Sequence, residues 1–179
     1  MPELSASALN RLHLRRGRYP EPGQQGEVLA NEAFAAAHGF QPGDRLKAVI
    51  NGKLETLTIV GIALSPEYIY QIRPGDFFPD DRRFGVLWMD RVNLSAAFDL
   101  TGAFNDVTLT LMHGAAEAEV LRRVDVLTAP YGGQMAYGRA YQVSNRYVSD
   151  ELTQLRTMAY IPPTIFLGVA AFILNVVLS

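Results

Sequence analysis

The chain has 179 residues, with 16 basic and 18 acidic side chains, 49% hydrophobic residues and no cysteine. Because the charges nearly balance, nothing favours a nucleic-acid partner, and the lack of cysteine excludes disulfides and cysteine-ligated metals. Without its apolar C-terminal stretch, the chain is long enough for one domain or two small lobes.

The first part of the chain predicts a loop, a strand and a short helix. Residues 1–25 are polar and predict a loop, and the segment from Glu27 to Ala30 predicts a short strand. Asn31 is placed to cap a helix over EAFAAAH, and Gly39 is placed to end it in the left-handed conformation.

The clearest local signal is a β-hairpin. Leu46, Ala48 and Ile50 alternate with polar residues, and Asn51-Gly52 follows before a strand over 54–64. An Asn-Gly pair between alternating strands favours a type I′ turn, because both central residues need a positive φ.

Strands and helices are predicted in turn after the hairpin. The expected elements are an extended segment at 68–72, a loop at 73–83, a buried strand at 84–89, a helix at 92–98, a half-buried strand at 107–111, a helix at 116–127 and a further strand at 134–138.

A long helix is expected from Ser144 onward. Apolar side chains recur in it at alternating intervals of four and three residues, at Val148, Leu152, Leu155, Ala159 and Pro162. This row, called the seam below, can pack against a partner helix or against the chain's own domain, and the pattern supports both alternatives equally.

The end of this helix has the composition of a membrane span. No charged residue follows Arg156, and residues 161–178 read IPPTIFLGVAAFILNVVL. A helix crosses a bilayer core with about 20 apolar residues. We therefore expect a stalk that continues into a membrane helix, with Pro162-Pro163 at the boundary between water and lipid.

Several landmarks follow one another in order along the chain. They are Glu27-Val28, Asn31 to Gly39, Gly43-Asp44, Asn51-Gly52, Ile59-Val60-Gly61, FGVLWMDRVNL, Asn105-Asp106-Val107 and ELTQLRTMAYIPPTIFLGVAAFILNVVLS. This order resembles the extracytoplasmic (periplasmic core) domain of FtsX-like, MacB-type ABC transporter permeases. The resemblance covers nearly the whole chain from about residue 17 and rests on the order of the motifs, since no single one is diagnostic.

The resemblance implies an α+β fold with two lobes, followed by a stalk helix that enters a transmembrane helix. The corresponding segments are 1–26 (N-terminal segment), 27–103 (β-rich lobe), 104–143 (porter-like lobe), 144–160 (stalk helix) and 161–179 (start of the transmembrane helix). Family members carry a membrane helix and a strand-containing segment before this region, and we expect both to be absent or cut short here.

The resemblance also implies a non-enzymatic role without a cofactor. Family permeases pair as dimers in the bacterial inner membrane and are driven by a cytoplasmic ABC ATPase, fused or separate, while this domain lies on the periplasmic side. The domain would couple ATP hydrolysis to envelope export, or to regulation of an envelope adaptor or substrate protein. Val148, Leu152 and Leu155 are then the candidate coupling residues.

Catalytic motifs are absent from the sequence. It contains no phosphate-binding loop, no nucleophile elbow and no HExxH zinc motif, and its three histidines share no ligand spacing. Asp76, Asp80 and Asp81 lie in one loop without a calcium-binding pattern, which favours turn-forming aspartates over a metal site.

The aromatic residues around that loop have two interpretations. They are Tyr68, Tyr70, Phe77 and Phe78. Apolar residues in a long loop either fill the domain's own core, which is the commoner use of aromatic side chains, or form a contact surface for a partner.

Two other functions compete with the permease hypothesis. One is a membrane-tethered binding or sensor domain without an ATPase, and the other is an envelope hydrolase anchored by its C-terminus. The scattered histidines argue against the hydrolase. Residues beyond 179 would separate a sensor from a permease, because several further helices fit only the permease.

Overall fold

A computed structural model describes residues 9–73, 75–76 and 78–178 of the chain. The protein is α+β, with a mixed sheet and a long C-terminal apolar helix, as the sequence predicts. It forms two compact units: residues 1–136 contain the sheet, and residues 137–179 contain the long helix.

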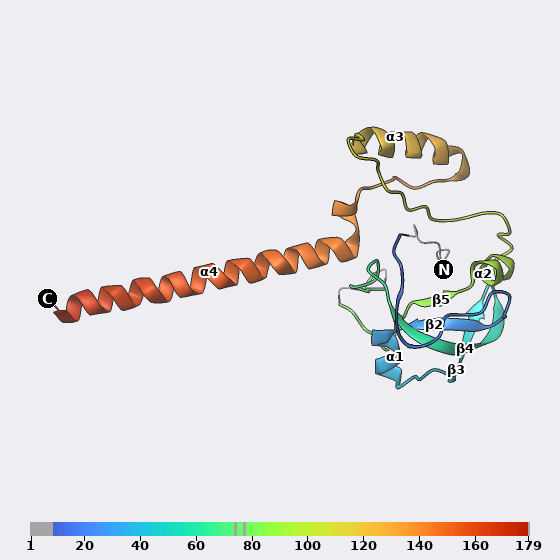
Figure 1. Cartoon of the computed structure of the whole chain (residues 1–179), viewed down its shortest axis with the longest axis horizontal. Coiled ribbons are helices and arrows are strands. Elements are labelled where there is room, and N and C mark those ends of the chain that lie inside the picture. Colours follow the sequence, from blue (N-terminus) through green and yellow to red (C-terminus); the bar gives the residue numbers. More distant parts are fainter. Residues whose placement is uncertain (1–8, 74, 77, 179) are drawn as a thin grey trace. The chain divides into compact units, whose positions relative to one another are not determined.

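The sheet is organised around one long strand (Figure 1). The strands in the described part of the chain are β1 (His13–Gly17), β2 (Glu27–Asn31), β3 (Arg45–Ile50), β4 (Lys53–Leu64) and β5 (Leu87–Met89). Their order is β1-β4-β2-β5, and β3 also pairs with β4. β2 and β4 are parallel, and the other pairs are antiparallel. The 12-residue β4 therefore contacts three other strands.

The β3–β4 hairpin forms as predicted. Ile50 pairs with Lys53 across the turn, and the two turn residues Asn51 and Gly52 have φ values of 48° and 78°. These positive φ values are those of a type I′ turn. Inner and outer side chains alternate along β3, so the hairpin covers the core with one face only.

The core is divided between the two faces of β2. Val28 and Ala30 belong to a cluster with Ile59 of β4, whereas Leu29 belongs to a second cluster with Trp88 of β5. Successive side chains of a strand point to opposite faces, so both faces of β2 are covered. Leu29 and Ala30 are fully buried.

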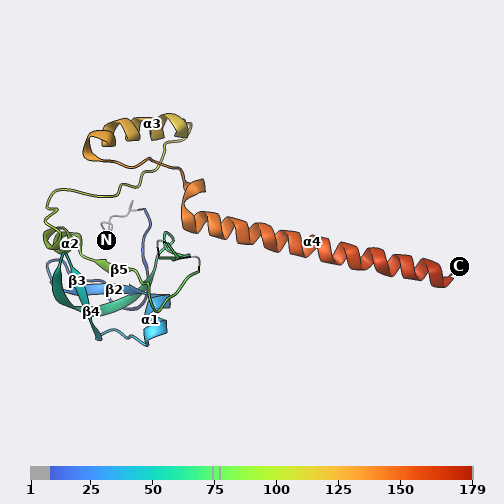
Figure 2. The same cartoon turned by 180° about the vertical axis from the view of Figure 1, so that it is seen from behind.

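The four predicted helices are confirmed. Each helix end that the sequence predicts agrees with the structure to within one residue. In the described residues they are α1 (Glu32–His38), α2 (Arg91–Ala97), α3 (Glu117–Thr128) and α4 (Val143–Leu178), with short 3-10 turns η1 (Ala129–Tyr131) and η2 (Arg139–Tyr141). Gly39 ends α1 with a φ of 72°, as expected. Both views place α1 and α2 at opposite ends of the sheet (Figures 1 and 2).

Asn31 does not cap α1 in the way that the sequence predicts. Its side chain occupies the N-cap position but makes no hydrogen bond to the helix. Instead, Asn31 Oδ1 accepts a hydrogen bond from the Val86 N–H at 2.9 Å, and the Asn31 N–H donates to Val86 O at 3.0 Å. Asn31 is 2% exposed, so it satisfies two backbone groups of the segment entering β5.

Strand β1 lies within the segment that was predicted to be a loop. It pairs antiparallel with β4, with Gly17 opposite Gly61. Gly17 has a φ of 78°, and a Cβ atom on either glycine would collide with the backbone of the other strand. The strand depends on this close approach between two glycines and on few apolar side chains, which is why local alternation does not reveal it.

Three predicted extended segments do not form strands. Residues 68–72, 107–111 and 134–138 carry no strand assignment, and the strand predicted at 84–89 is limited to β5. In 107–111 the alternating apolar side chains Val107, Leu109 and Leu111 remain 50%, 54% and 42% exposed. A strand needs a paired neighbour, and no described residue pairs with these segments.

Candidate functional site

The C-terminal part of α4 is the clearest candidate for a functional element. Among the described residues, α4 is the one helix long and apolar enough to cross a membrane, and none of its most apolar 18-residue window is buried. Residues 161–178 rise about 27 Å at 1.5 Å per residue. That length matches a hydrocarbon core of about 30 Å.

The start of α4 is fixed by side chains of its own unit. Gln142 Oε1 accepts a hydrogen bond from the Asn145 N–H at 2.6 Å, which satisfies a free donor of the first turn. The Gln142 carbonyl accepts from the Arg146 N–H at 2.9 Å, and Arg139 Nε donates to Asn145 Oδ1 at 3.1 Å. These contacts explain a helix that begins at Val143, one residue before the predicted start.

The seam residues of the stalk share one face of α4 and are accessible. Leu152 and Leu155 are 53% and 60% exposed, and Val148 is half-buried. At 100° per residue, these three side chains fall within about 60° of one another around the helix. The described residues of the stalk thus leave this apolar strip open to a partner.

Hydroxyl side chains of the stalk bond back to the helix itself. Ser149 Oγ donates to Asn145 O at 2.8 Å, Thr153 Oγ1 donates to Ser149 O at 2.9 Å, and Thr157 Oγ1 donates to Thr153 O at 2.9 Å. Because these hydroxyls already donate hydrogen bonds within α4, they contribute little to polar contacts with a partner. The apolar seam is therefore the more distinctive face of the stalk.

The candidate aromatic contact residues are in different environments. Phe78 is 80% exposed, whereas Tyr68 is 38% exposed and meets the ring of Trp88 edge-on, with ring centroids 6.2 Å apart. Tyr70 is half-buried, and Phe77 lies outside the described residues. Tyr68 thus contributes to packing, and Phe78 is the candidate that is available to a partner.

The acidic loop before β5 forms turns. Asp80 Oδ1 accepts hydrogen bonds from the backbone N–H groups of Arg82 and Arg83, at 3.0 and 3.2 Å. The same loop lines an open, shallow depression that includes Asp76 and Phe78. No group of three or more histidine, aspartate or glutamate side chains lies within reach of a common metal in the described residues.

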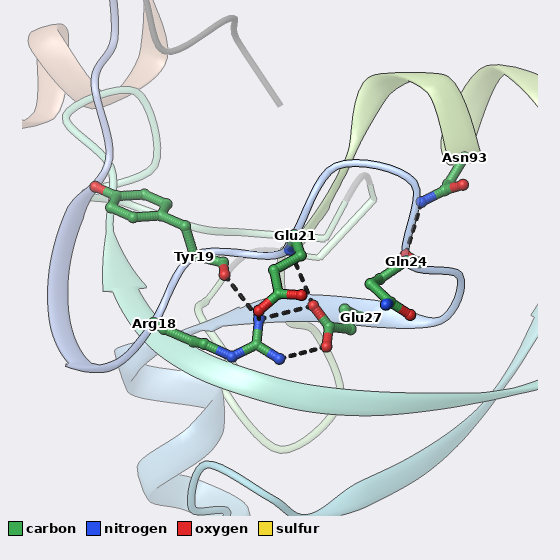
Figure 3. A network of polar contacts seen from close by, with 6 residues as sticks. All are labelled: Arg18, Tyr19, Glu21, Gln24, Glu27 and Asn93. Atoms are coloured by element: carbon green, nitrogen blue, oxygen red, sulfur yellow. Dashed lines mark hydrogen bonds and ion pairs between the residues drawn. The ribbon is translucent and has the colours of Figure 1, made fainter.

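Arg18 and Glu27 form an ion pair with two contacts that closes the loop between β1 and β2 (Figure 3). Arg18 Nη1 lies 2.8 Å from Glu27 Oε2, and Arg18 Nη2 donates to Oε1. Glu27 also accepts a hydrogen bond from the Glu21 N–H at 3.0 Å. The hydrogen bond from Arg18 is the main cause of a lowered pKa at Glu27.

The same loop is tied to α2. Asn93 Nδ2 donates to Gln24 O at 2.7 Å (Figure 3). Arg15 of β1 pairs with Glu32 of α1, with Nε 3.2 Å from Oε1, so this ion pair joins the strand to the helix. The sequence did not reveal these pairs, because their partners lie 9 to 69 positions away without a periodic pattern.

Glu67 is a half-buried carboxyl group that joins two distant segments. Its Oε2 accepts a hydrogen bond from Asn10 Nδ2 at 3.3 Å, and its backbone N–H donates to Ser65 Oγ at 3.2 Å. Burial and then repulsion from Asp106 raise the pKa of Glu67, while the bond from Asn10 opposes the shift. No sequence motif marks this residue.

His38 lies at the end of α1, within an aromatic cluster. Its ring stacks on Phe40 with centroids 5.3 Å apart and contacts Phe34 at 4.6 Å. Its Nε2 lies 2.9 Å from Arg82 O, so the ring also holds the acidic loop. The arrangement gives this histidine a packing role.

The geometry thus brings together an α+β domain, an accessible apolar strip and a helix of membrane-spanning length in one chain. Comparisons with family models, with curated proteins and with solved structures find no match to this chain.

Proposed function

We propose that this chain is a non-catalytic extracytoplasmic domain of an ABC transporter permease subunit of the FtsX-like, MacB type. In this role it couples ATP hydrolysis by a cytoplasmic ATPase to export across the envelope, or to regulation of an envelope adaptor or substrate protein. The permease works as a dimer in the bacterial inner membrane, with this domain on the periplasmic side.

One observation carries the proposal. A folded α+β domain precedes, in the same chain, a single helix whose first part is polar with an apolar seam and whose second part is uncharged. A continuous helix is an ordered element that can carry a movement of the membrane part toward the domain. The order of the sequence landmarks supports the same family, and their spacing contains no catalytic motif.

The two-lobed arrangement is part of the proposal. The segment 107–111 and α3 would form the porter-like lobe, in which α3 has no buried residue and the apolar side chains of 107–111 are exposed. Members of the resembled family carry a strand-containing segment before this region. Such a strand would pair with 107–111 and cover its apolar side chains.

The seam provides the test of coupling. In the full-length permease, Leu152→Asn with Leu155→Asn is expected to abolish transport while ATP hydrolysis and assembly with the ATPase persist. The reason is that both substitutions place polar groups on the face that must pack against a moving partner. Transport and ATPase activity are measured in the same proteoliposomes.

Val143→Asn is the matched control. Val143 is 58% exposed and lies about 180° around α4 from Leu152 at 100° per residue, so it removes a similar apolar side chain away from the seam. Transport should survive this change. Normal transport in the Leu152/Leu155 variant would refute the coupling role.

A membrane-tethered sensor domain is the alternative. It shares the folded domain and the candidate membrane helix but needs no ATPase. Purification of the full-length protein from its native membrane separates the two: a stoichiometric ABC ATPase supports the permease, and its absence together with signalling upon ligand binding supports the sensor.

A further inference from the structure

Two consecutive prolines lie inside α4. Pro162 and Pro163 fall within the helix Val143–Leu178, which continues through them as one element (Figure 2). Proline has no backbone N–H, so the carbonyls of Met158 and Ala159 lose their normal partners four residues ahead. The described residues supply no side-chain donor to either carbonyl. The helix thus contains one turn in which two backbone hydrogen bonds are missing.

Threonine hydroxyls bond to backbone carbonyls next to this turn, a contact that often bends a helix. Thr157 Oγ1 donates to Thr153 O at 2.9 Å before the prolines, and Thr164 Oγ1 donates to Tyr160 O at 2.7 Å across them. The two missing backbone hydrogen bonds of α4 both fall within residues 158–163. A proline also disfavours helical geometry in the residue before it, which here affects both Ile161 and Pro162.

The position of the weak turn relative to the bilayer matters. Arg156 is the last charged residue of the chain, and the apolar run begins at Ile161. The carbonyls of Met158 and Ala159 thus lie near the surface of the bilayer, where water and lipid headgroups can hydrogen-bond to them. Deeper in the hydrocarbon core, such unpaired carbonyls would have no partner.

A second arrangement of the same residues is compatible with these prolines. Proline is favoured at the first position of a helix, where a missing N–H and a fixed φ do no harm. One helix can therefore end near Tyr160 and a new one can begin at Pro162, with a different axis. Sharp bends in helices occur mainly at such sites.

We propose that residues 158–163 form a hinge, called the joint below, between the water-exposed part of α4 and its membrane span. The two parts are rigid helices, and their mutual angle changes at this turn. The inference concerns α4 alone and requires neither an ATPase nor a second copy, so it stands or falls independently of the permease function.

Amide residual dipolar couplings of the complete chain in lipid bicelles test the joint. In the native sequence, couplings of 144–157 and of 164–178 should require two alignment tensors of different magnitude. In Pro162→Ala with Pro163→Ala, both N–H donors return and a single tensor should fit both parts. Alanine is the strongest helix former, so this variant keeps the helix.

Ile161→Ala is the matched control, since it changes a neighbouring side chain and keeps both prolines. It should retain two tensors. A native chain that fits one tensor across both parts would overturn the joint, and so would a double alanine variant that still needs two. Circular dichroism of all three proteins verifies equal helix content.

Discussion

Gly61 offers the sharpest test of how this sheet is held together. An alanine Cβ at this position would lie 2.6 Å from Arg18 O, 2.9 Å from Arg16 O and 2.8 Å from Leu29 Cδ2. Two of these three atoms belong to the backbone of the segment that includes β1, so they cannot rotate away. Unlike Gly17, Gly61 is not among the residues with a positive φ, and the effect of the substitution is steric.

The magnitude follows from three contributions. Overpacking a core position costs about 1–3 kcal/mol, and displacing β1 weakens at least one sheet hydrogen bond, worth about 1 kcal/mol. Against this, replacing glycine with alanine stabilises by about 0.4–1 kcal/mol through the unfolded chain. We therefore expect Gly61→Ala to lower the free energy of unfolding by about 1–4 kcal/mol.

Urea unfolding in detergent micelles measures the effect. Trp88 is the chain's single tryptophan and is 8% exposed within the core, so its fluorescence reports on the sheet. With a slope of about 2 kcal/mol per molar urea, the midpoint should fall by about 0.5–2 M.

Gly52→Ala is the control for that measurement. Gly52 has a φ of 78° but open space around it, so only the backbone conformation is penalised, by about 1–2 kcal/mol. An unchanged or raised midpoint in Gly61→Ala would refute the close-approach argument.

Two further predictions concern Glu67 and the aromatic residues. Because the folded-state pKa of Glu67 is raised, its contribution to stability is fully present below the unfolded-state pKa and is lost as the pH rises through the folded-state value. Glu67→Gln should therefore raise the melting temperature at pH 7.5 but not at pH values near 4; a pH-independent difference would contradict the assignment. Phe78→Ala should leave stability within about 0.5 kcal/mol, since Phe78 is 80% exposed, whereas Tyr68→Ala should cost about 1–2 kcal/mol by losing its contact with Trp88. Circular dichroism is the appropriate probe for that pair, because Tyr68 contacts the fluorophore, and equal losses would contradict the different roles assigned to them.

The elements that the sequence predicted correctly are those specified by adjacent residues. The turn at Asn51-Gly52 needs positive φ at two neighbours, and the end of α1 needs Gly39 in the left-handed region, so both can be identified locally. The apolar run of α4 is equally local, because bilayer thickness fixes its length.

The features that the sequence did not reveal depend on distant partners. Strand β1 exists because Gly17 meets Gly61, 44 positions later, and Asn31 bonds to Val86 rather than to its own helix. At 107–111 the opposite happened. The alternation of apolar and polar residues predicts a strand, but no described residue pairs with this segment. For the candidate site, the common face of the seam residues was predictable from spacing, whereas their exposure and the positions of Tyr68 and Glu67 depended on tertiary contacts.

The central position of β4 has a consequence for the order of folding. β1 and β2 come first along the chain, but each finds its main partner only in the last residues of β4, at 61–64 and 58–63. In the described part of the chain, the β3–β4 hairpin is the one pairing between strands adjacent in sequence. Because its contacts are local, we expect this hairpin to form first, before β1, β2 and β5 join the sheet. A slip of register in the hairpin would then be passed on to every later strand.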